Sequence, residues 1–190
     1  MGKILDKIKS TTYPQGKVVG PKENCLVISD NIIKETRFSP GMAKMGYHGH
    51  GNELHKFTFY NEIKWLKKLN NVDFIPNLIS YDEQLLTIKM NYVGEPLSNV
   101  NIPKNWKEQC INIINKLVEN NCSHNDIKPE DILVLNDKIH LVDYGWATEI
   151  NESIPPNWPD TIGGDFKFDI KNFNDHYSLF MSINYILYNE

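Results

Sequence analysis

Some segments of the chain contain short runs of apolar residues, and others have apolar residues at helical spacing. These two patterns predict its strands and helices. Apolar runs at 17–19, 24–28 and 32–36 are typical of β-strands, with a tight turn at 29–31. From about 52 to 69 the period becomes helical, which predicts an amphipathic helix. Its inward positions are Phe59, Ile63, Leu66 and Leu69. The first third of the chain is therefore expected to form a β-meander and one helix.

The remaining patterns predict mainly helices with one hairpin. A strand pair is expected from 75 to 90, and a second amphipathic helix from about 105 to 120. The predicted inward positions of that helix are Ile111, Ile114, Leu117 and Val118. Two short apolar runs joined by a turn follow within 123–147, and the apolar stretch 177–188 predicts a buried helix, too short to span a membrane. Strands first and helices later favour the α+β fold class.

Three carboxylates stand at the ends of the apolar runs within 123–147. Asp131 follows Asp126 by five positions, and Asp143 lies on the far side of the predicted hairpin. Such an arrangement can gather one proton acceptor and two oxygen ligands for a hard cation such as Mg²⁺ into one pocket. Asp137, in the turn, is interpreted as an ordinary turn carboxylate.

Two motifs within 123–147 resemble the catalytic and metal-binding loops of protein kinases, H-R-D-L-x-x-x-N and D-F-G. They are HNDIKPEDILV at 124–134 and VDYG at 142–145. The chain departs from the family pattern by Asn125 in place of arginine, Asp131 in place of asparagine and Tyr144 in place of phenylalanine.

The resemblance covers roughly residues 12–188 and implies a two-lobed protein kinase-like fold. Its expected parts are a small β-rich N-lobe at 1–90, a hinge at 91–96 and a truncated helical C-lobe at 97–190. A β-rich half followed by a helical half agrees with the order of the predicted elements.

The resemblance also implies roles for particular residues, with ATP and Mg²⁺ as cofactors. Asp126 would accept the proton of the incoming hydroxyl, and Lys128 would offset the charge of the transferred phosphate. Asp131 and Asp143 would hold Mg²⁺. His124 is expected to brace the loop from the core. Asp175 resembles the family's aspartate that holds the catalytic-loop backbone.

The nucleotide-binding half is expected to use a lysine and its carboxylate partner. Lys34 follows two apolar residues and resembles the V-A-I-K lysine that reaches the α- and β-phosphates. Glu62 is the predicted ion-pair partner of Lys34, and Glu53 is the alternative candidate. The other expected nucleotide contacts are Gly16 and Gly20 in the sparse glycine loop, Met90 at the gatekeeper position, and the backbone of Asn91 and Val93 for adenine.

The composition and net charge of the chain limit the classes of molecule that it is expected to bind. The formal net charge of the 190 residues is −4, and the Lys64, Lys67 and Lys68 cluster is interpreted as a solvated helix face, so no nucleic acid or anionic membrane is expected.

Arg37 is the only arginine in the sequence, so no arginine cluster is available to bind a phosphorylated activation loop, which favours activity without phosphorylation of that loop. The three widely spaced cysteines, and the lack of a signal peptide, indicate a cytoplasmic protein. His48, His50 and His55 lack the spacing of a known zinc site.

These observations predict an ATP- and Mg²⁺-dependent phosphotransferase, a minimal serine/threonine protein kinase whose partner is a protein with a Ser or Thr hydroxyl. Two alternatives stay open. One is a kinase for a small molecule such as a sugar or aminoglycoside, since the A-P-E motif is absent. The other is a pseudokinase that binds nucleotide and acts on a partner kinase, which the poor glycine loop favours. The oligomeric state is not predicted.

Overall fold

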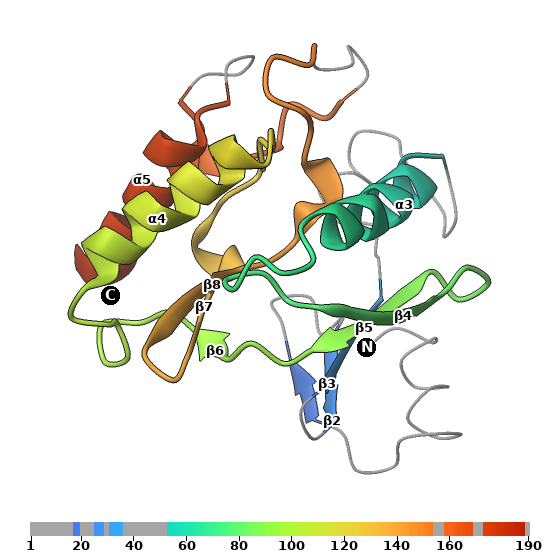
Figure 1. The fold of residues 1–190 in the computed structure, drawn as a ribbon, viewed down its shortest axis with the longest axis horizontal. Helices are drawn as coiled ribbons and strands as arrows, with labels where there is room; N and C mark the ends of the chain where they lie inside the picture. Colours follow the sequence, from blue (N-terminus) through green and yellow to red (C-terminus); the bar gives the residue numbers. More distant parts are fainter. Residues whose placement is uncertain are drawn as a thin grey trace. The chain divides into compact units, whose positions relative to one another are not determined.

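The computed structural model describes six stretches of the chain: residues 17–19, 25–28, 31–35, 53–153, 158–168 and 173–188. It has a mixed α and β composition with small antiparallel sheets, as the α+β class requires (Figure 1). The chain divides into two compact units. The first comprises Met1–Asn70 and Pro76–Tyr92, and the second comprises Asn71–Ile75 and Val93–Glu190. The predicted Gly16, Gly20, His48 and His50 lie outside the described residues.

The first unit contains a five-stranded antiparallel sheet in the order β1-β2-β3-β5-β4. Its strands are β1 (Lys17–Val19), β2 (Cys25–Ile28), β3 (Asn31–Glu35), β4 (Leu78–Asp82) and β5 (Thr87–Asn91). The three strands predicted before residue 37 are confirmed, with ends that differ by one residue.

Helix α3 (Glu53–Lys68) belongs to the same unit and confirms the helix predicted from about 52 to 69. All four predicted inward residues are buried, Phe59 completely so. The Phe59 ring meets Tyr81 of β4 edge-on, with centroids 6.4 Å apart, so the helix packs against this part of the sheet (Figure 1). An acid in the first turn, Glu53, and the lysines of the last turn complement the helix dipole.

The second unit contains α4 (Trp106–Glu119) and α5 (Asp175–Tyr188), which pack together (Figure 1). The rings of Trp106 and Phe180 lie 5.9 Å apart between them. Helix α4 ends at an asparagine pair, because Asn121 adopts the left-handed conformation (φ 51°) that asparagine tolerates better than most residues.

The predicted inward face of α4 is wrong in part. The buried residues are Cys110, Ile113 and Leu117, whereas Ile111 and Val118 are 52% and 60% exposed. The helix carries apolar residues on more than one face, so several helical spacings fit its sequence equally well. The packing partners, not the periodicity, decide which face turns inward.

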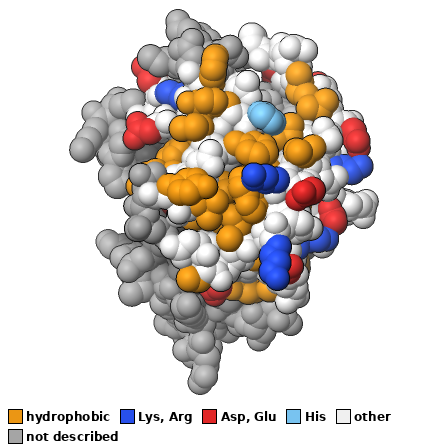
Figure 2. Space-filling view, turned by 90° about the vertical axis from the view of Figure 1, so that its left-hand side faces the viewer, with side chains coloured by type: hydrophobic (Ala, Val, Ile, Leu, Met, Phe, Trp, Pro, Cys, Tyr) orange, Lys and Arg blue, Asp and Glu red, His pale blue; other side chains and the backbone are white. Residues whose placement is uncertain are grey.

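Helix α5 is also less buried than predicted. One face is in the core, whereas Met181, Tyr185 and Tyr188 are exposed. Figure 2, which views the side of the molecule where α4 and α5 lie, shows hydrophobic side chains gathered on that face. Apolar residues occur all around α5, so a continuous apolar run did not distinguish a half-buried helix from a buried one.

A three-stranded sheet in the second unit carries the predicted hairpin. Strands β7 (Ile132–Leu135) and β8 (Lys138–Leu141) are joined by Asn136 and Asp137, both at positive φ, as a tight hairpin turn requires. Strand β6 (Glu95–Pro96) pairs with β7, so part of the predicted hinge at 91–96 is a strand. Gly94 fits because it has φ 113° and because a Cβ there would lie 2.0 Å from the Val134 carbonyl oxygen.

Candidate functional site

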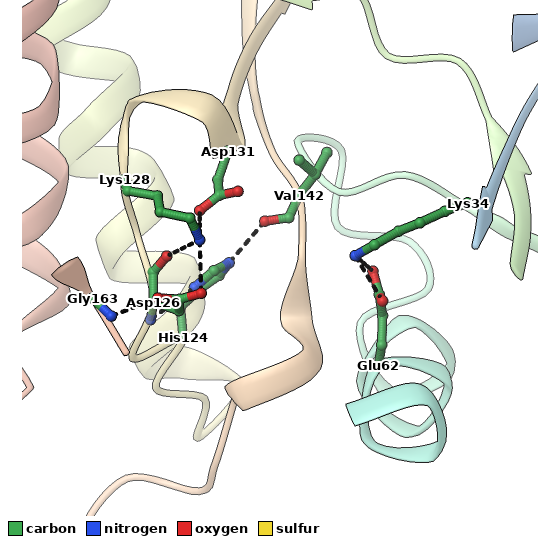
Figure 3. Close-up of polar contacts among 8 residues, drawn as sticks. All are labelled: Lys34, Glu62, His124, Asp126, Lys128, Asp131, Val142 and Gly163. Carbon is green, nitrogen blue, oxygen red and sulfur yellow. Dashed lines mark hydrogen bonds and ion pairs between the residues drawn. The ribbon is translucent and has the colours of Figure 1, made fainter. Parts of the chain in front are cut away.

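Three charged side chains meet around the short 3₁₀ helix η1 (Pro129–Asp131) of the second unit (Figure 3). The Nζ atom of Lys128 lies 2.7 Å from Oδ2 of Asp126 and 3.0 Å from Oδ2 of Asp131. The single turn of η1 places Lys128 and Asp131 three positions apart on the same side. The structure therefore brings together the two residues expected to be catalytic and one of the two expected to hold metal.

Asp143, the third acid, follows β8 and precedes the 3₁₀ helix η2 (Tyr144–Trp146). Its backbone is left-handed, with φ 70° and ψ 62°. The Val142 N–H donates a hydrogen bond of 3.0 Å to the carbonyl of Asp131, which joins the two acidic segments. The carboxylate of Asp143 shifts the pKa of both Lys128 and Asp131, so it belongs to the same electrostatic cluster.

Burial and charge compete in this cluster. Burial lowers the pKa of Lys128, but the carboxylates of Asp131, Asp126 and Asp143 outweigh it and raise that pKa well above its ordinary value. Burial raises the pKa of Asp131 well above the ordinary value, Asp143 and Asp126 raise it further, and Lys128 opposes them. The surroundings therefore favour the protonated form of Lys128, and the neighbouring carboxylates favour additional positive charge beside Asp131.

The oxygens of Asp131 and Asp143 fit a hard divalent cation. Oδ2 of Asp131 is buried and, apart from its ion pair with Lys128, has no hydrogen-bond partner among the described residues. Carboxylate oxygens are the protein ligands that Mg²⁺ prefers, and Mg²⁺ takes its other ligands from phosphates and water. Among the described residues no group of three or more His, Cys, Asp and Glu side chains is arranged to hold a metal alone.

His124 braces this cluster from the core. It is fully buried, its Nε2 lies 3.0 Å from the carbonyl of Val142, and its Nδ1 accepts a 3.4 Å hydrogen bond from the Asp126 N–H. Burial lowers the pKa of His124, although Asp175 opposes this shift. The two contacts suit a neutral imidazole with its proton on Nε2.

Asp175, at the start of α5, holds the backbone before Asp126. Its Oδ2 accepts a 2.6 Å hydrogen bond from the His124 N–H, and its Oδ1 accepts one of 2.9 Å from the Asn125 N–H. These are the backbone contacts that the resemblance implied for Asp175.

Asn125 has a role that the sequence did not reveal. Its Nδ2 donates to the carbonyl of Trp146 at 2.8 Å and to Oγ1 of Thr148 at 3.0 Å, and its Oδ1 accepts from the Ser123 hydroxyl at 2.7 Å. The residue has φ 67° and is buried. Comparison with the kinase motif identifies Asn125 only by the arginine it replaces. The tolerance of asparagine for left-handed backbone is the signal that could have found its role.

Gly163 is a second residue that sequence reasoning missed. Its N–H donates a 2.5 Å hydrogen bond to Oδ1 of Asp126. A backbone donor from a loop has no side-chain signature, so no sequence pattern could have identified it.

The first unit contains the expected lysine–glutamate pair. Nζ of Lys34 in β3 lies 3.0 Å and 2.9 Å from the two carboxylate oxygens of Glu62 in α3 (Figure 3). Glu62 is 2% exposed at its side chain, whereas the rival Glu53 is 94% exposed and pairs with Lys56. The ion pair is thus present with Glu62, and its part in nucleotide binding stays a prediction.

The other expected nucleotide contacts lie on or near β5. Met90 is buried within β5, and Val93 is buried just after it. The Asn91 N–H donates to the carbonyl of Asn77 at 3.2 Å, so this donor is already used. Adenine binding by these residues stays a prediction.

Several expected features are settled by burial. Lys64, Lys67 and Lys68 are exposed, as interpreted. Cys110 and Cys122 are both buried, and burial raises the pKa of Cys110 to about 12, so this thiol is unreactive. No helix in the described stretches has the length and apolarity needed to cross a bilayer.

Comparison with known proteins gives partial similarities to two proteins named as kinases. The chain is 29% identical over 103 residues, 54% of its length, to cyclin-dependent kinase F-4 of Oryza sativa subsp. japonica. It is 40% identical over 55 residues, 29% of its length, to the provisionally named serine/threonine-protein kinase R436 of Acanthamoeba polyphaga mimivirus. The chain spans 22% of the first protein and 20% of the second. No protein-family model matches the chain. These matches suggest a distant relationship to kinases over part of the sequence.

Proposed function

We propose that this protein is an ATP- and Mg²⁺-dependent phosphotransferase of the two-lobed protein kinase type, acting on a Ser or Thr hydroxyl of a protein. The single observation that carries the proposal is the Asp126–Lys128–Asp131 cluster, with Lys128 Nζ 2.7 Å and 3.0 Å from the two carboxylates. The partial similarity to proteins named as kinases supports the same reaction class.

The cluster contains the two groups that phosphoryl transfer needs beside the acceptor hydroxyl, a proton acceptor and a cation. Asp126 would orient the hydroxyl and accept its proton as the hydroxyl oxygen bonds to the γ-phosphorus and the bond to ADP breaks. Lys128, held protonated, would offset the charge on the transferred group. A neutral lysine could not do this, so the upward pKa shift favours the role.

Asp131 and Asp143 would hold Mg²⁺, which when bound neutralises charge on the phosphates. The buried oxygen of Asp131 and its raised pKa both favour a cation there. Lys34, fixed by its two contacts with Glu62, is proposed to contact the α- and β-phosphates.

Phosphate transfer from labelled ATP tests the proposal directly. We expect Mg²⁺-dependent transfer to generic protein acceptors, reduced at least about 100-fold by Asp126→Asn, because that change removes the proton acceptor. Asp137→Asn is the matched control, since Asp137 lies in the exposed hairpin turn. It should leave the rate unchanged.

Other outcomes identify the alternatives. Thermal stabilisation by ATP and Mg²⁺ without transfer to any acceptor would point to a nucleotide-binding pseudokinase. Transfer only to a sugar or aminoglycoside would keep the reaction but replace the substrate. Equal rates for wild type, Asp126→Asn and Asp137→Asn would refute the proposed role of Asp126.

A further inference from the structure

The loop at 158–168 is fixed by aromatic and aliphatic anchors. The ring of Trp158 lies 5.0 Å from that of Trp146, and Ile162 is 3% exposed. At the other end the ring of Phe166 lies 5.4 Å from that of Tyr185 on α5. The short 3₁₀ helix η3 (Gly164–Phe166) closes the loop between these anchors.

The glycine between the anchors reaches the candidate catalytic acid. The Gly163 N–H donates a buried 2.5 Å hydrogen bond to Oδ1 of Asp126, and Lys128 holds the other carboxylate oxygen at 2.7 Å (Figure 3). Each oxygen therefore has one fixed donor. A carboxylate held at both oxygens cannot turn about its terminal torsion without losing a contact to one of them.

The contact depends on a glycine at this position. Gly163 has φ +74°, and a Cβ there would lie 2.9 Å from the Cβ of Lys167 and 3.4 Å from the carbonyl oxygen of Asn125. Its neighbour Gly164 has φ +51° but open space around the same position. A methyl group at 163 would move the amide away from Asp126, whereas one at 164 would meet nothing.

We propose that Gly163 is a positioning residue, whose amide sets the orientation in which Asp126 meets the acceptor hydroxyl. An ionised carboxylate has about four lone-pair sites. With one site on each oxygen taken by Gly163 and Lys128, the direction of the remaining sites is fixed relative to the incoming hydroxyl. The inference rests on the proposed function of Asp126, and it gives one residue of the loop at 158–168, Gly163, a role in the site.

Kinetics of matched glycine variants test the role. Gly163→Ala is expected to lower kcat by about 10- to 100-fold with the KM for ATP unchanged, because a displacement of about 1 Å can cost that much in rate. Gly164→Ala carries a similar backbone strain without the clash, and it should keep kcat within about threefold. Gly163→Ala combined with Lys167→Gly removes the closest clashing atom and should recover most of the lost rate.

A spectroscopic test needs no activity. In the ¹⁵N-glycine spectrum of a chain with eleven glycines, the Gly163 amide proton is expected far downfield. It should move upfield in Asp126→Ala. The Gly164 N–H donates to the Thr161 carbonyl at 3.1 Å, so its signal should stay in place and serves as the internal control.

The two tests separate the possible failures. A wild-type protein that phosphorylates no acceptor refutes the proposed function, whatever the spectrum shows. An active wild type with equal kcat for Gly163→Ala and Gly164→Ala refutes the positioning role. A Gly163 signal that does not move in Asp126→Ala refutes the contact itself, and this result decides the matter if Gly163→Ala fails to fold.

Discussion

Single residues in the candidate site adopt backbone conformations that most side chains avoid. Asn125 and Asp143 both have φ near 70°. Asn125 precedes Asp126, and Asp143 is itself proposed to hold Mg²⁺. Left-handed backbone costs roughly 1–2 kcal/mol per residue, less for Asn and Asp than for others. The surrounding hydrogen bonds of Asn125 offset this cost.

Tyr144 carries an unsatisfied group in the core of the second unit. Its side chain is completely buried, and its ring meets His124 edge-on at 4.6 Å. Within the part of the chain that the structure describes, its hydroxyl has no hydrogen-bond partner. Burial also raises the pKa of this hydroxyl well above its ordinary value. Tyr144→Phe keeps the ring and removes the orphaned oxygen. We expect the free energy of unfolding to rise by roughly 1–2 kcal/mol in urea denaturation.

The control for this prediction is an exposed tyrosine. Tyr188 is 78% exposed, so its hydroxyl contacts water and Tyr188→Phe should change stability by less than about 0.5 kcal/mol. A loss of stability in Tyr144→Phe would mean that its hydroxyl has a partner, such as a buried water molecule.

At the scale of elements, α4 offers two isoleucines that differ in environment. Ile113 is 2% exposed and Ile111 is 52% exposed. Ile113→Ala should lower the free energy of unfolding by about 2–4 kcal/mol, because it leaves a cavity in the core. Ile111→Ala should cost less than about 0.5 kcal/mol. Chemical denaturation of both variants measures the difference, and equal losses would contradict the buried face seen in the structure.

The same helix shows what the sequence could and could not predict. Helix and strand positions follow from local periodicity, so α3, α4 and α5 were predicted almost to their ends, and the β7–β8 hairpin was predicted within 123–147. The buried face of α4 was predicted only in part, because it depends on partners distant in the chain. The strand β6 was missed for the same reason: it exists only by pairing with β7.

In the candidate site too, residues close together in the sequence were predicted, whereas contacts between distant residues were not. Asp126, Lys128 and Asp131 lie within one short segment. The spacing of the acids predicted that they would share a pocket, and the resemblance to protein kinases added Lys128. The contacts of Asn125 with Trp146 and of Gly163 with Asp126 link residues 21 and 37 positions apart and involve backbone groups. Local patterns carry no record of such contacts, so they become visible only after folding.

At the scale of the whole molecule, the pH dependence of folding reports on histidines buried in the second unit. His140 on β8 is 7% exposed, and its Nδ1 has no hydrogen-bond partner in the described stretches. Burial lowers its pKa, and the nearby Lys138 lowers it further, against a hydrogen bond to the Phe74 backbone and the charge of Asp73. The folded state therefore favours the neutral imidazole more than the unfolded state does.

This difference in the pKa of His140 between the folded and unfolded states determines how stability changes with pH. Above a pH of about 6.5, the ordinary value for histidine, both states are neutral and the stability is fully present. As the pH falls from there through the lowered pKa of the folded state, only the unfolded chain takes up the proton, so stability is lost.

His140→Gln keeps a donor for the Phe74 carbonyl but does not titrate. We expect its urea midpoint to fall less than that of the wild type between pH 7 and pH 5, the remainder coming from groups such as His124, whose pKa is also lowered. His176, exposed on α5, is the control; if His176→Gln flattened the profile as much as His140→Gln, burial of His140 could not be the cause.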